Sequence, residues 1–402
     1  MNRTQHRIYF DHAATTAVRP EVADVIYDVM KHVYGNPSSL YKEGHEAAHL
    51  VSDARARLAD ILNCAPNELY FTSCGTESDN WAIKGTAFKL AGKGKHLITS
   101  KIEHHAILHS MEWLKTQGFD ITYLDVDELG RVNPQDVAAA IREDTILVSI
   151  MMANNEVGTI QPIEEIARIC HEKQVLFHCD AVQAFGAIPI DVKKLGVDMM
   201  SFSGHKLGTP KGIGLMYMRR GVRIDNLIHG GAQEYGKRAG TENVPYIVGL
   251  AKAAELAMAE MPEKTARLTE LREYLVKELL SKIPHSRYNG DPVHRLPNNM
   301  NFSFEFIEGE SILLMLDALG YDTSSGSACA SSDLKPSHVL LAIGLPAEIA
   351  HGSIRITLGS DNTKEDVEAL AQDLPEIIER LRQMSPLWEA FQKGEIENCL
   401  IP

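Results

Sequence analysis

The sequence has few of the residues that hold small domains together through covalent or metal links. Only six of its 402 residues are cysteine, and no two of them are spaced as CxxC. A disulfide framework and a zinc ribbon are therefore not expected. No apolar run approaches the roughly 20 residues of a membrane span, and the first residues contain no apolar signal core. These absences predict a soluble, cytoplasmic protein with no membrane partner.

Basic residues are also in the minority. Lysine and arginine number 40 against 54 aspartate and glutamate residues, which gives a net charge of −14. Such a chain is poorly suited to broad electrostatic binding of nucleic acid, so no nucleic-acid partner is expected. What the chain does have is 44% hydrophobic and 23% charged residues, the balance of a globular protein. Its length predicts two or three domains.

The middle of the chain alternates short β-rich runs with helical patterns. Strands are expected at residues 69–72, 97–99, 121–124, 146–151, 175–179, 199–203 and 214–218, and helices at 108–116, 134–142 and 163–172. Because strands and helices alternate over short links, we expect an α/β fold with a mostly parallel, doubly wound sheet.

The pattern changes after about residue 260. A long amphipathic helix is expected at 262–283, followed by a strand at 300–306, a helix at 310–319 and a strand at 353–358. This order without strict alternation predicts a smaller α+β domain. We therefore expect a large domain over 16–260, a small domain over 1–15 and 261–384, and a C-terminal tail over 385–402. The tail has little periodicity and is expected to be loose.

One lysine follows the strand expected at 199–203, in the run Ser203-Gly204-His205-Lys206. A lysine just past the carboxyl end of a strand in an α/β sheet lies where ligands bind. With a lowered pKa, such a lysine can form a Schiff base with an aldehyde cofactor. For this segment taken alone, a solvated loop lysine is the alternative.

Other chemically useful residues also follow strands. Asp180 could pair with a protonated ring nitrogen, or it could cap a helix. Gly75 and Thr76 open a helix whose N–H groups suit a phosphate, although a plain capping box has the same pattern. His104 could lie over a cofactor ring or be structural, and Asn155 follows the next strand. In this serial order the segments are what a pyridoxal-phosphate site needs.

Seven segments share a pattern with a known group of enzymes. They are residues 11–16 (DHAATT), 35–39 (GNPSS), 71–80, 153–156 (ANNE), 201–206 (SFSGHK), 238–243 (RAGTEN) and 324–329 (SSGSAC). In this order they resemble the class V aminotransferase-like group of fold type I enzymes, and most closely the NifS/IscS-type cysteine desulfurases. The resemblance runs nearly end to end.

This resemblance implies pyridoxal 5'-phosphate as the cofactor and L-cysteine as the substrate. Lys206 would form the Schiff base with the cofactor, Asp180 would pair with its pyridine nitrogen, and His104 would stack on its ring. The other cofactor-binding residues that it implies are Gly75, Thr76, Asn155, Gln183, Ser203, His205 and, from the partner subunit of a homodimer, Thr241. Asn155 and Arg355 would also take the substrate carboxylate, for which a planar guanidinium is suited.

The resemblance assigns Cys329 as the sulfur acceptor. Its surroundings are small, polar and glycine-rich, which predicts a mobile loop; an incidental loop cysteine is the alternative. The Cys329 thiolate would attack the substrate sulfur, leaving a persulfide on the enzyme and alanine as product. A nearby cation would lower the pKa of this thiol, and His104 is the expected cation. The resemblance further implies an iron–sulfur scaffold protein as acceptor, with no intrinsic metal site but transient iron–sulfur ligation through the Cys329 persulfide.

Two other classes of function remain open on the sequence. A selenocysteine lyase or another class V enzyme would share the fold, although an aminotransferase needs no thiol in a flexible loop. The other class is a non-catalytic pyridoxal-phosphate protein that acts as a regulator or scaffold, and the presence of Lys206, Asp180, His104 and Cys329 together argues against it. In the tail, Trp388 and Phe391 are expected either to contact a partner or to dock the tail on the small domain. For residues 395–402 a partner role is expected.

Overall fold

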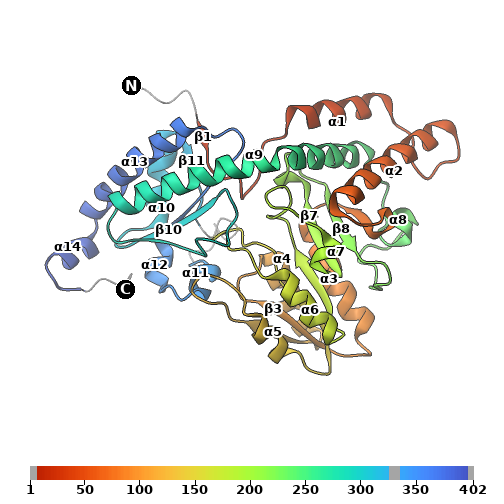
Figure 1. Ribbon diagram of the computed structural model, residues 1–402, viewed down its shortest axis with the longest axis horizontal. Coiled ribbons are helices and arrows are strands. Elements are labelled where there is room, and N and C mark those ends of the chain that lie inside the picture. Colours follow the sequence, from red (N-terminus) through yellow and green to blue (C-terminus); the bar gives the residue numbers. More distant parts are fainter. Residues whose placement is uncertain (1–6, 326–335, 397–402) are drawn as a thin grey trace.

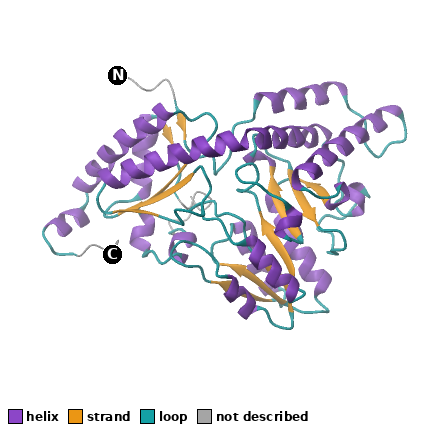
Figure 2. Cartoon of the chain, in the orientation of Figure 1, coloured by secondary structure: helices purple, strands orange, loops and turns teal. Residues whose placement is uncertain are grey.

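The computed structural model describes residues 7–325 and 336–396. Its centre is a seven-stranded sheet in the order β2-β8-β7-β6-β5-β3-β4. These strands are β2 (Leu69–Thr72), β3 (His96–Ser100), β4 (Asp120–Leu124), β5 (Thr145–Ser149), β6 (Leu176–Asp180), β7 (Met199–Ser203) and β8 (Gly214–Met218). Six of these strands run in the same direction, and β8, between β2 and β7, runs in the opposite direction. The predicted α/β fold with a mostly parallel sheet is confirmed (Figures 1 and 2).

Helices cover both faces of the central sheet. Those of the first two thirds of the chain are α1 (Pro20–His32), α2 (Lys42–Leu62), α3 (Gly75–Leu90), α4 (His105–Thr116), α5 (Pro134–Ala140), α6 (Ile163–Glu172), α7 (Val192–Leu195), α8 (Gln233–Gly236) and the 3₁₀ turns Pro66–Glu68 and Gly204–Lys206. Successive strand residues point to opposite faces. Leu97 thus packs in the core with α3 and α4, and Ile98 in the larger core with α1, α2 and α6. Burial on both faces explains why these strands read as continuous apolar runs.

A second core surrounds a smaller sheet. Its elements are β9 (Ser286–Tyr288), β10 (Asn299–Phe304), α10 (Gly309–Leu319), β12 (Ser353–Thr357) and α13 (Lys364–Gln383), with the two-stranded sheet β1 (Ile8–Tyr9) and β11 (Tyr321–Asp322) beside them. Phe10 packs in this core with Phe302 and Leu370. The N-terminal strand therefore joins the C-terminal part of the chain. The helices α11 (His338–Ala342) and α12 (Ala347–His351) belong to a further cluster that includes Ile102 and Met151 of the large-sheet region.

The long helix α9 (Val244–Lys282) runs through both cores (Figure 1). Sequence periodicity predicted its start at 262, but Pro262 lies inside the helix, which begins at Val244 after the Asn243 cap. A proline removes a single backbone hydrogen bond, and here the buried faces on either side of it stabilise the helix. The expected domain limit at 260/261 falls within α9, and the division into domains stays a prediction.

The tail is more ordered than its sequence predicts. Residues 386–392 form α14 (Pro386–Gln392), capped by the Ser385 hydroxyl, so the expectation of a loose segment is wrong there. Phe391 stacks on Phe306 with ring centroids 4.8 Å apart, and Trp388 lies 5.3 Å from the same ring. These two aromatic side chains dock the tail on the second core. No helix in the described ranges is both long enough and apolar enough to span a bilayer.

Candidate active site

The residues expected at the site come together at one edge of the central sheet. Strands β2, β3, β5, β6 and β7 run in the same direction, because β8 is antiparallel to both β2 and β7. Their carboxyl ends therefore share one edge, the usual place for a ligand in an open α/β sheet. Asp180 is the last residue of β6, and Gly75, His104, Asn155 and Lys206 follow the ends of β2, β3, β5 and β7.

Lys206 ends a short 3₁₀ turn directly after β7. Its Nζ donates to the carbonyl oxygens of Ala13 at 2.5 Å and Ala14 at 2.7 Å. Gln183 donates from Nε2 to the same Ala13 oxygen at 2.9 Å. The lysine and the glutamine are thus neighbours, as the proposed cofactor roles require.

Asp180 is the last residue of β6 and is buried. Burial raises the pKa of its carboxyl, while the Val182 N–H, at 2.9 Å from Oδ1, and the charge of Lys206 favour the ionised form. A buried carboxylate that is held by one amide and faces a cation is suited to pair with a protonated ring nitrogen.

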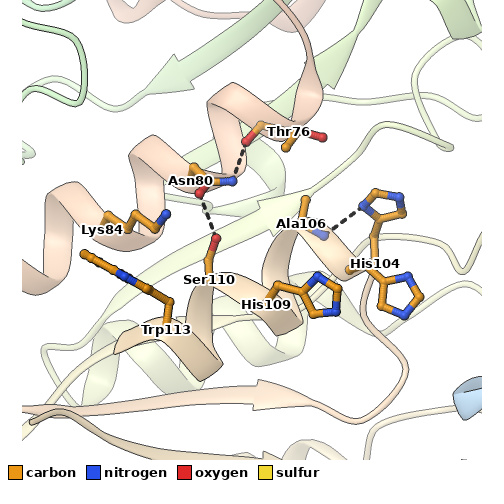
Figure 3. A pocket seen from close by; sticks show the side chains of 9 residues that line it. Thr76, Asn80, Lys84, His104, Ala106, His109, Ser110 and Trp113 are labelled. Carbon is orange, nitrogen blue, oxygen red and sulfur yellow. Dashed lines mark hydrogen bonds between the residues drawn. The ribbon is translucent and has the colours of Figure 1, made fainter. Parts of the chain in front are cut away.

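His104 caps the N-terminus of α4 (Figure 3). The charge of Lys206 is close enough to act on its ring. The Ala106 N–H donates to His104 Nδ1 at 3.1 Å, so the proton of the neutral ring is on Nε2. Burial and the charge of Lys206 lower the pKa of His104. A lowered pKa disfavours a protonated ring near pH 7. Cys329 lies outside the described residues, so the role of His104 as the cation beside it stays a prediction. His104 and Thr76 line an open pocket of about 400 Å³.

The beginning of α3 forms a cradle with the residues after β6 and β7. A Cβ on Gly75 would lie 2.6 Å from Val182 Cγ2 and 3.4 Å from Ser203 Cβ, so Gly75 and Ser203 are adjacent and a side chain at 75 would fill the space. Thr76 is exposed in the first turn of the helix. His205 contacts the Thr15 hydroxyl at 3.1 Å, and burial lowers its pKa to about 4. The helix N-terminus gives this cradle free N–H groups, which suit a phosphate.

Arg355 lies on β12 of the smaller sheet, and its side chain is 3% exposed. Nη1 donates to the Asn155 carbonyl oxygen at 3.2 Å and Nη2 to Asp11 Oδ1 at 2.8 Å. Nε is buried and has no hydrogen-bond partner within residues 7–325 and 336–396. The structure therefore brings Asn155 and Arg355 together, with a buried donor available to a carboxylate.

The N-terminal segment 11–16 contributes more to the site than its sequence indicates. The sequence predicts no role for any residue of this motif. In the structure it supplies the Ala13 and Ala14 carbonyls to Lys206, the Thr15 hydroxyl to His205 and the Asp11 carboxylate to Arg355. Its signals in the sequence are the shared motif and the run of small residues at 13–16.

Two expected site residues are not tested by these contacts. Thr241 is exposed on the chain that carries it, although the Arg238–Glu77 ion pair, at 2.8 Å, ties its loop to α3. Cys329 lies outside the described residues. The chain on either side of its segment reaches the site, since Ser324 pairs with the backbone of Arg355 and the Ser337 hydroxyl donates to Glu156. Within the described ranges, no group of three ligating side chains could hold a metal ion.

The whole sequence and the fold are similar to those of known proteins. Residues 8–370 match the family model described as aminotransferase class-V. The chain belongs to the class-V aminotransferase family. A relative from Methanosarcina thermophila named cysteine desulfurase IscS is 57% identical over 94% of both chains. One of the same name from Dictyoglomus turgidum is 53% identical over 97% of this chain and all of the relative. The family predicted from the motifs is confirmed.

Solved structures of class-V relatives have the same fold. A NifS-like protein superposes with a TM-score of 0.88 at 41% identity, over 94% of this chain and all of that one. A structure described as SspA in complex with cysteine gives 0.78 at 38% identity, over 88% of this chain and 99% of the other. The protein is a pyridoxal-phosphate-dependent enzyme, as predicted. Its site fits this cofactor, because Lys206, Gln183 and Asp180 converge beside the cradle that a Cβ at Gly75 would fill.

Proposed function

We propose that the protein is a cysteine desulfurase that converts L-cysteine to L-alanine and retains the sulfur on Cys329. The observation that carries the proposal is the convergence of Lys206, Asp180 and Arg355 at one site. It is supported by relatives named cysteine desulfurase over nearly the full chain and by the relative solved with cysteine.

Each residue has a role that its surroundings support. When bound, pyridoxal phosphate supplies an electron sink for the α-carbon of an amino acid. Arg355 binds the substrate carboxylate with the help of Asn155. Lys206 is the base that takes a proton from the substrate, and His104 holds a proton on Nε2 that it can give back. Asp180 stabilises positive charge on the ring nitrogen.

The sulfur step is a displacement at the substrate sulfur. The thiolate of Cys329 forms an S–S bond as the Cβ–S bond of the substrate breaks, and the carbon fragment takes up a proton and is released as alanine. Thiol and substrate thus become persulfide and L-alanine with no external oxidant. Only a thiolate can make this attack.

Other cysteines are less suited to this attack. Burial raises the pKa of the Cys64 and Cys170 thiols to about 12, and that of Cys179 well above its usual range. They therefore remain protonated near neutral pH. Cys74 caps α3 within the expected phosphate cradle. This supports Cys329, whose glycine-rich neighbourhood the sequence shows.

Release of alanine from cysteine by the purified holoenzyme, with a small-molecule reductant, tests the proposal. Cys329→Ala is expected to bind cysteine, seen as a change in the cofactor absorbance, but to release almost no alanine. Cys399→Ala, the matched control in the tail, should have wild-type output. Normal alanine release by Cys329→Ala would contradict the persulfide step. Alanine release from selenocysteine that is far faster than from cysteine would indicate a selenocysteine lyase instead.

The enzyme is further proposed to be a homodimer in which Thr241 completes the partner's phosphate site. Large apolar side chains gather at the end of α1 and in the link to α2, where Tyr34 is 84% and Leu40 92% exposed. Tyr27, Met30 and Tyr41 are also more than half exposed there. An apolar surface of this kind suits burial against another protein. If Thr241 completes the site of another subunit, that protein must be a second copy of this chain.

The sulfur acceptor is proposed to be an iron–sulfur scaffold protein in the cytoplasm, bound in part by residues 395–402. Of these, 397–402 lie outside the described residues. Deleting 395–402 should leave alanine release with a small-molecule reductant nearly unchanged and weaken sulfur transfer to the scaffold protein. Equal loss in both assays would mean that the tail supports the fold. Unchanged scaffold binding would place the partner surface elsewhere.

A further inference from the structure

The carboxylate-binding arginine of this site already has a negatively charged partner. Asp11 Oδ1 accepts from Arg355 Nη2 at 2.8 Å, and the two side chains are 17% and 3% exposed. Because the pair is largely screened from water, its mutual attraction is stronger than that of a surface pair. A substrate carboxylate that reaches Arg355 therefore meets a guanidinium whose charge is partly balanced.

Asp11 is held in place by backbone contacts on both sides. It forms a bridge with Thr357 of β12, two residues from Arg355, and its carbonyl oxygen accepts from the Tyr9 hydroxyl at 3.0 Å and the Ala14 N–H at 3.0 Å. The carboxylate is thus fixed next to the guanidinium by the same segment that reaches Lys206.

The guanidinium still has donors for a second anion. Arginine has five N–H groups, and the described contacts of Arg355 use two nitrogens, Nη1 toward Asn155 and Nη2 toward Asp11. Nε has no partner within the described residues. A second carboxylate can therefore bind beside Asp11 rather than in its place, but the two like charges then repel each other across one cation.

We propose that Asp11 is a specificity-determining residue that orients Arg355 and, through its negative charge, weakens the binding of amino-acid carboxylates at this site. This rests on the proposed function, in which Arg355 receives the carboxylate of L-cysteine and releases that of L-alanine. Glu156 is another carboxyl that Arg355 influences, but it accepts from the Ser337 hydroxyl, and burial raises its pKa to about 7. Asp11 is thus the carboxylate in direct contact with the guanidinium.

The decisive variant is Asp11→Asn, which keeps an oxygen acceptor for Nη2 and removes the charge. Binding to the holoenzyme is measured by titrating the cofactor absorbance with L-alanine and with ethylamine, which lacks the carboxylate. L-Alanine should bind roughly three- to tenfold more tightly to Asp11→Asn than to wild type, because one repulsive charge is gone, whereas ethylamine affinity should not change. The KM for L-cysteine should fall by a similar factor.

Matched variants separate charge from folding. Asp28→Asn removes the same charge from an exposed site on α1 and should leave both affinities at wild-type values. Asp11→Ser provides a second uncharged variant with an oxygen acceptor if Asp11→Asn folds poorly, as judged by its melting temperature. Unchanged or weaker L-alanine binding in the folded Asp11 variants would overturn the inference, as would an equal change for ethylamine.

The outcomes also distinguish this inference from the proposed function. Selective tightening for L-alanine without any alanine release from cysteine would support the role of Asp11 and contradict the desulfurase. Alanine release from cysteine with no selective change in carboxylate binding would support the desulfurase and contradict the role of Asp11.

Discussion

Lys206 is the side chain that we propose bonds to the cofactor. Its position after β7 was predicted from the sequence, but its contacts with the Ala13 and Ala14 carbonyls were not. These contacts fix the amino group beside Gln183 and close enough to Asp180 to influence its pKa. An amine placed in this way can bond to the aldehyde of a cofactor.

Lys206→Ala is expected to remove the covalent link between protein and cofactor. After borohydride reduction of the wild-type holoenzyme, mass spectrometry should find the pyridoxyl group on the peptide that contains Lys206, and Lys206→Ala should carry none. Lys211→Ala, which alters a lysine in the following loop, is the control and should be labelled like wild type. A cofactor fixed to the Lys206→Ala protein would show that another lysine forms the bond.

The surroundings of His338 keep its ring unprotonated in the folded protein. Its Nε2 contacts the Glu103 carbonyl oxygen at 3.0 Å, and burial lowers its pKa to about 4. The folded state therefore excludes a proton that the unfolded chain, with a histidine pKa near 6.5, takes up. Stability from this residue is present above about pH 6.5 and is lost as the pH falls toward 4.

His338→Gln keeps a donor for the Glu103 carbonyl and does not titrate. Relative to this variant, the wild type should lose up to about 1.4 kcal/mol of unfolding free energy per pH unit between about pH 6.5 and 4. Urea unfolding at several pH values measures this difference. A difference between the two proteins that stays constant with pH would contradict a neutral His338 in the folded state.

Among the elements, the start of α3 shows how a helix shapes the cofactor cradle. Gly75 is needed there because a Cβ would lie 2.6 Å from Val182 Cγ2. The helix can therefore approach Val182 after β6 and Ser203 at the end of β7 closely, and its first N–H groups suit a phosphate there. The sequence predicted this helix N-terminus, but not the close approach.

Gly75→Ala should weaken cofactor binding by about tenfold, because overpacking at a tight contact costs about 1–3 kcal/mol. Val182→Ala in the same chain should restore part of the affinity by removing the colliding methyl group. Fluorescence titration of the apoenzyme with pyridoxal phosphate measures both. The control is Gly92→Ala, where a Cβ would meet nothing within 4 Å. Wild-type affinity in Gly75→Ala would show that the cradle tolerates a side chain.

Helix α14 stabilises the second core through its aromatic face. Trp388→Ala should lower the unfolding free energy by about 1–2 kcal/mol, because Trp388 packs on Phe306, Phe391 and His285. Alanine release at 25 °C should stay at the wild-type rate. Leu387→Ala, at a side chain that is 56% exposed, should change stability by less than about 0.5 kcal/mol. Equal effects of the two variants would mean that α14 does not depend on this aromatic contact.

At the scale of the whole molecule, the site lies where the two cores meet. Lys206 and Asp180 come from the central sheet, whereas Arg355 comes from β12 of the second core. The segment 11–16 connects the two sides, and α9 passes through both cores. A change in the packing of either core would therefore displace one half of the site relative to the other.

Subunit mixing can test the proposed homodimer and the place of Thr241 together. Lys206→Ala chains supply an intact Thr241, and Thr241→Ala chains supply an intact Lys206. If Thr241 acts in the partner's site, each dimer with one chain of each variant has one intact site and one defective site. About half of the dimers refolded from equal amounts of the two chains are mixed, so about one quarter of the sites should be active at limiting cofactor. Mixtures with no more activity than the separate variants would place Thr241 in its own chain's site. A monomeric mass by light scattering would contradict the dimer.

The sequence by itself determined the central sheet and the order of its site residues. Short apolar runs between helical patterns predicted its seven strands to within about two residues. This was possible because a strand that is buried on both faces is a continuous apolar run in the sequence. Several of these strands end at or just before a residue with a chemical use, so the sequence indicated Gly75, His104, Asp180 and Lys206. The helices α1 and α2 were not predicted.

Only the tertiary structure decided the features that depend on residues far apart in the chain. Asp11 and Arg355 are 344 residues apart, and Lys206 is 193 residues from Ala13; no local pattern reports such a pair. The neutral state of His104 follows from burial and from the charge of Lys206, and the continuity of α9 through Pro262 follows from packing on both sides. Burial and long-range charge are properties of the folded chain, which is why these four features could not be predicted from the sequence.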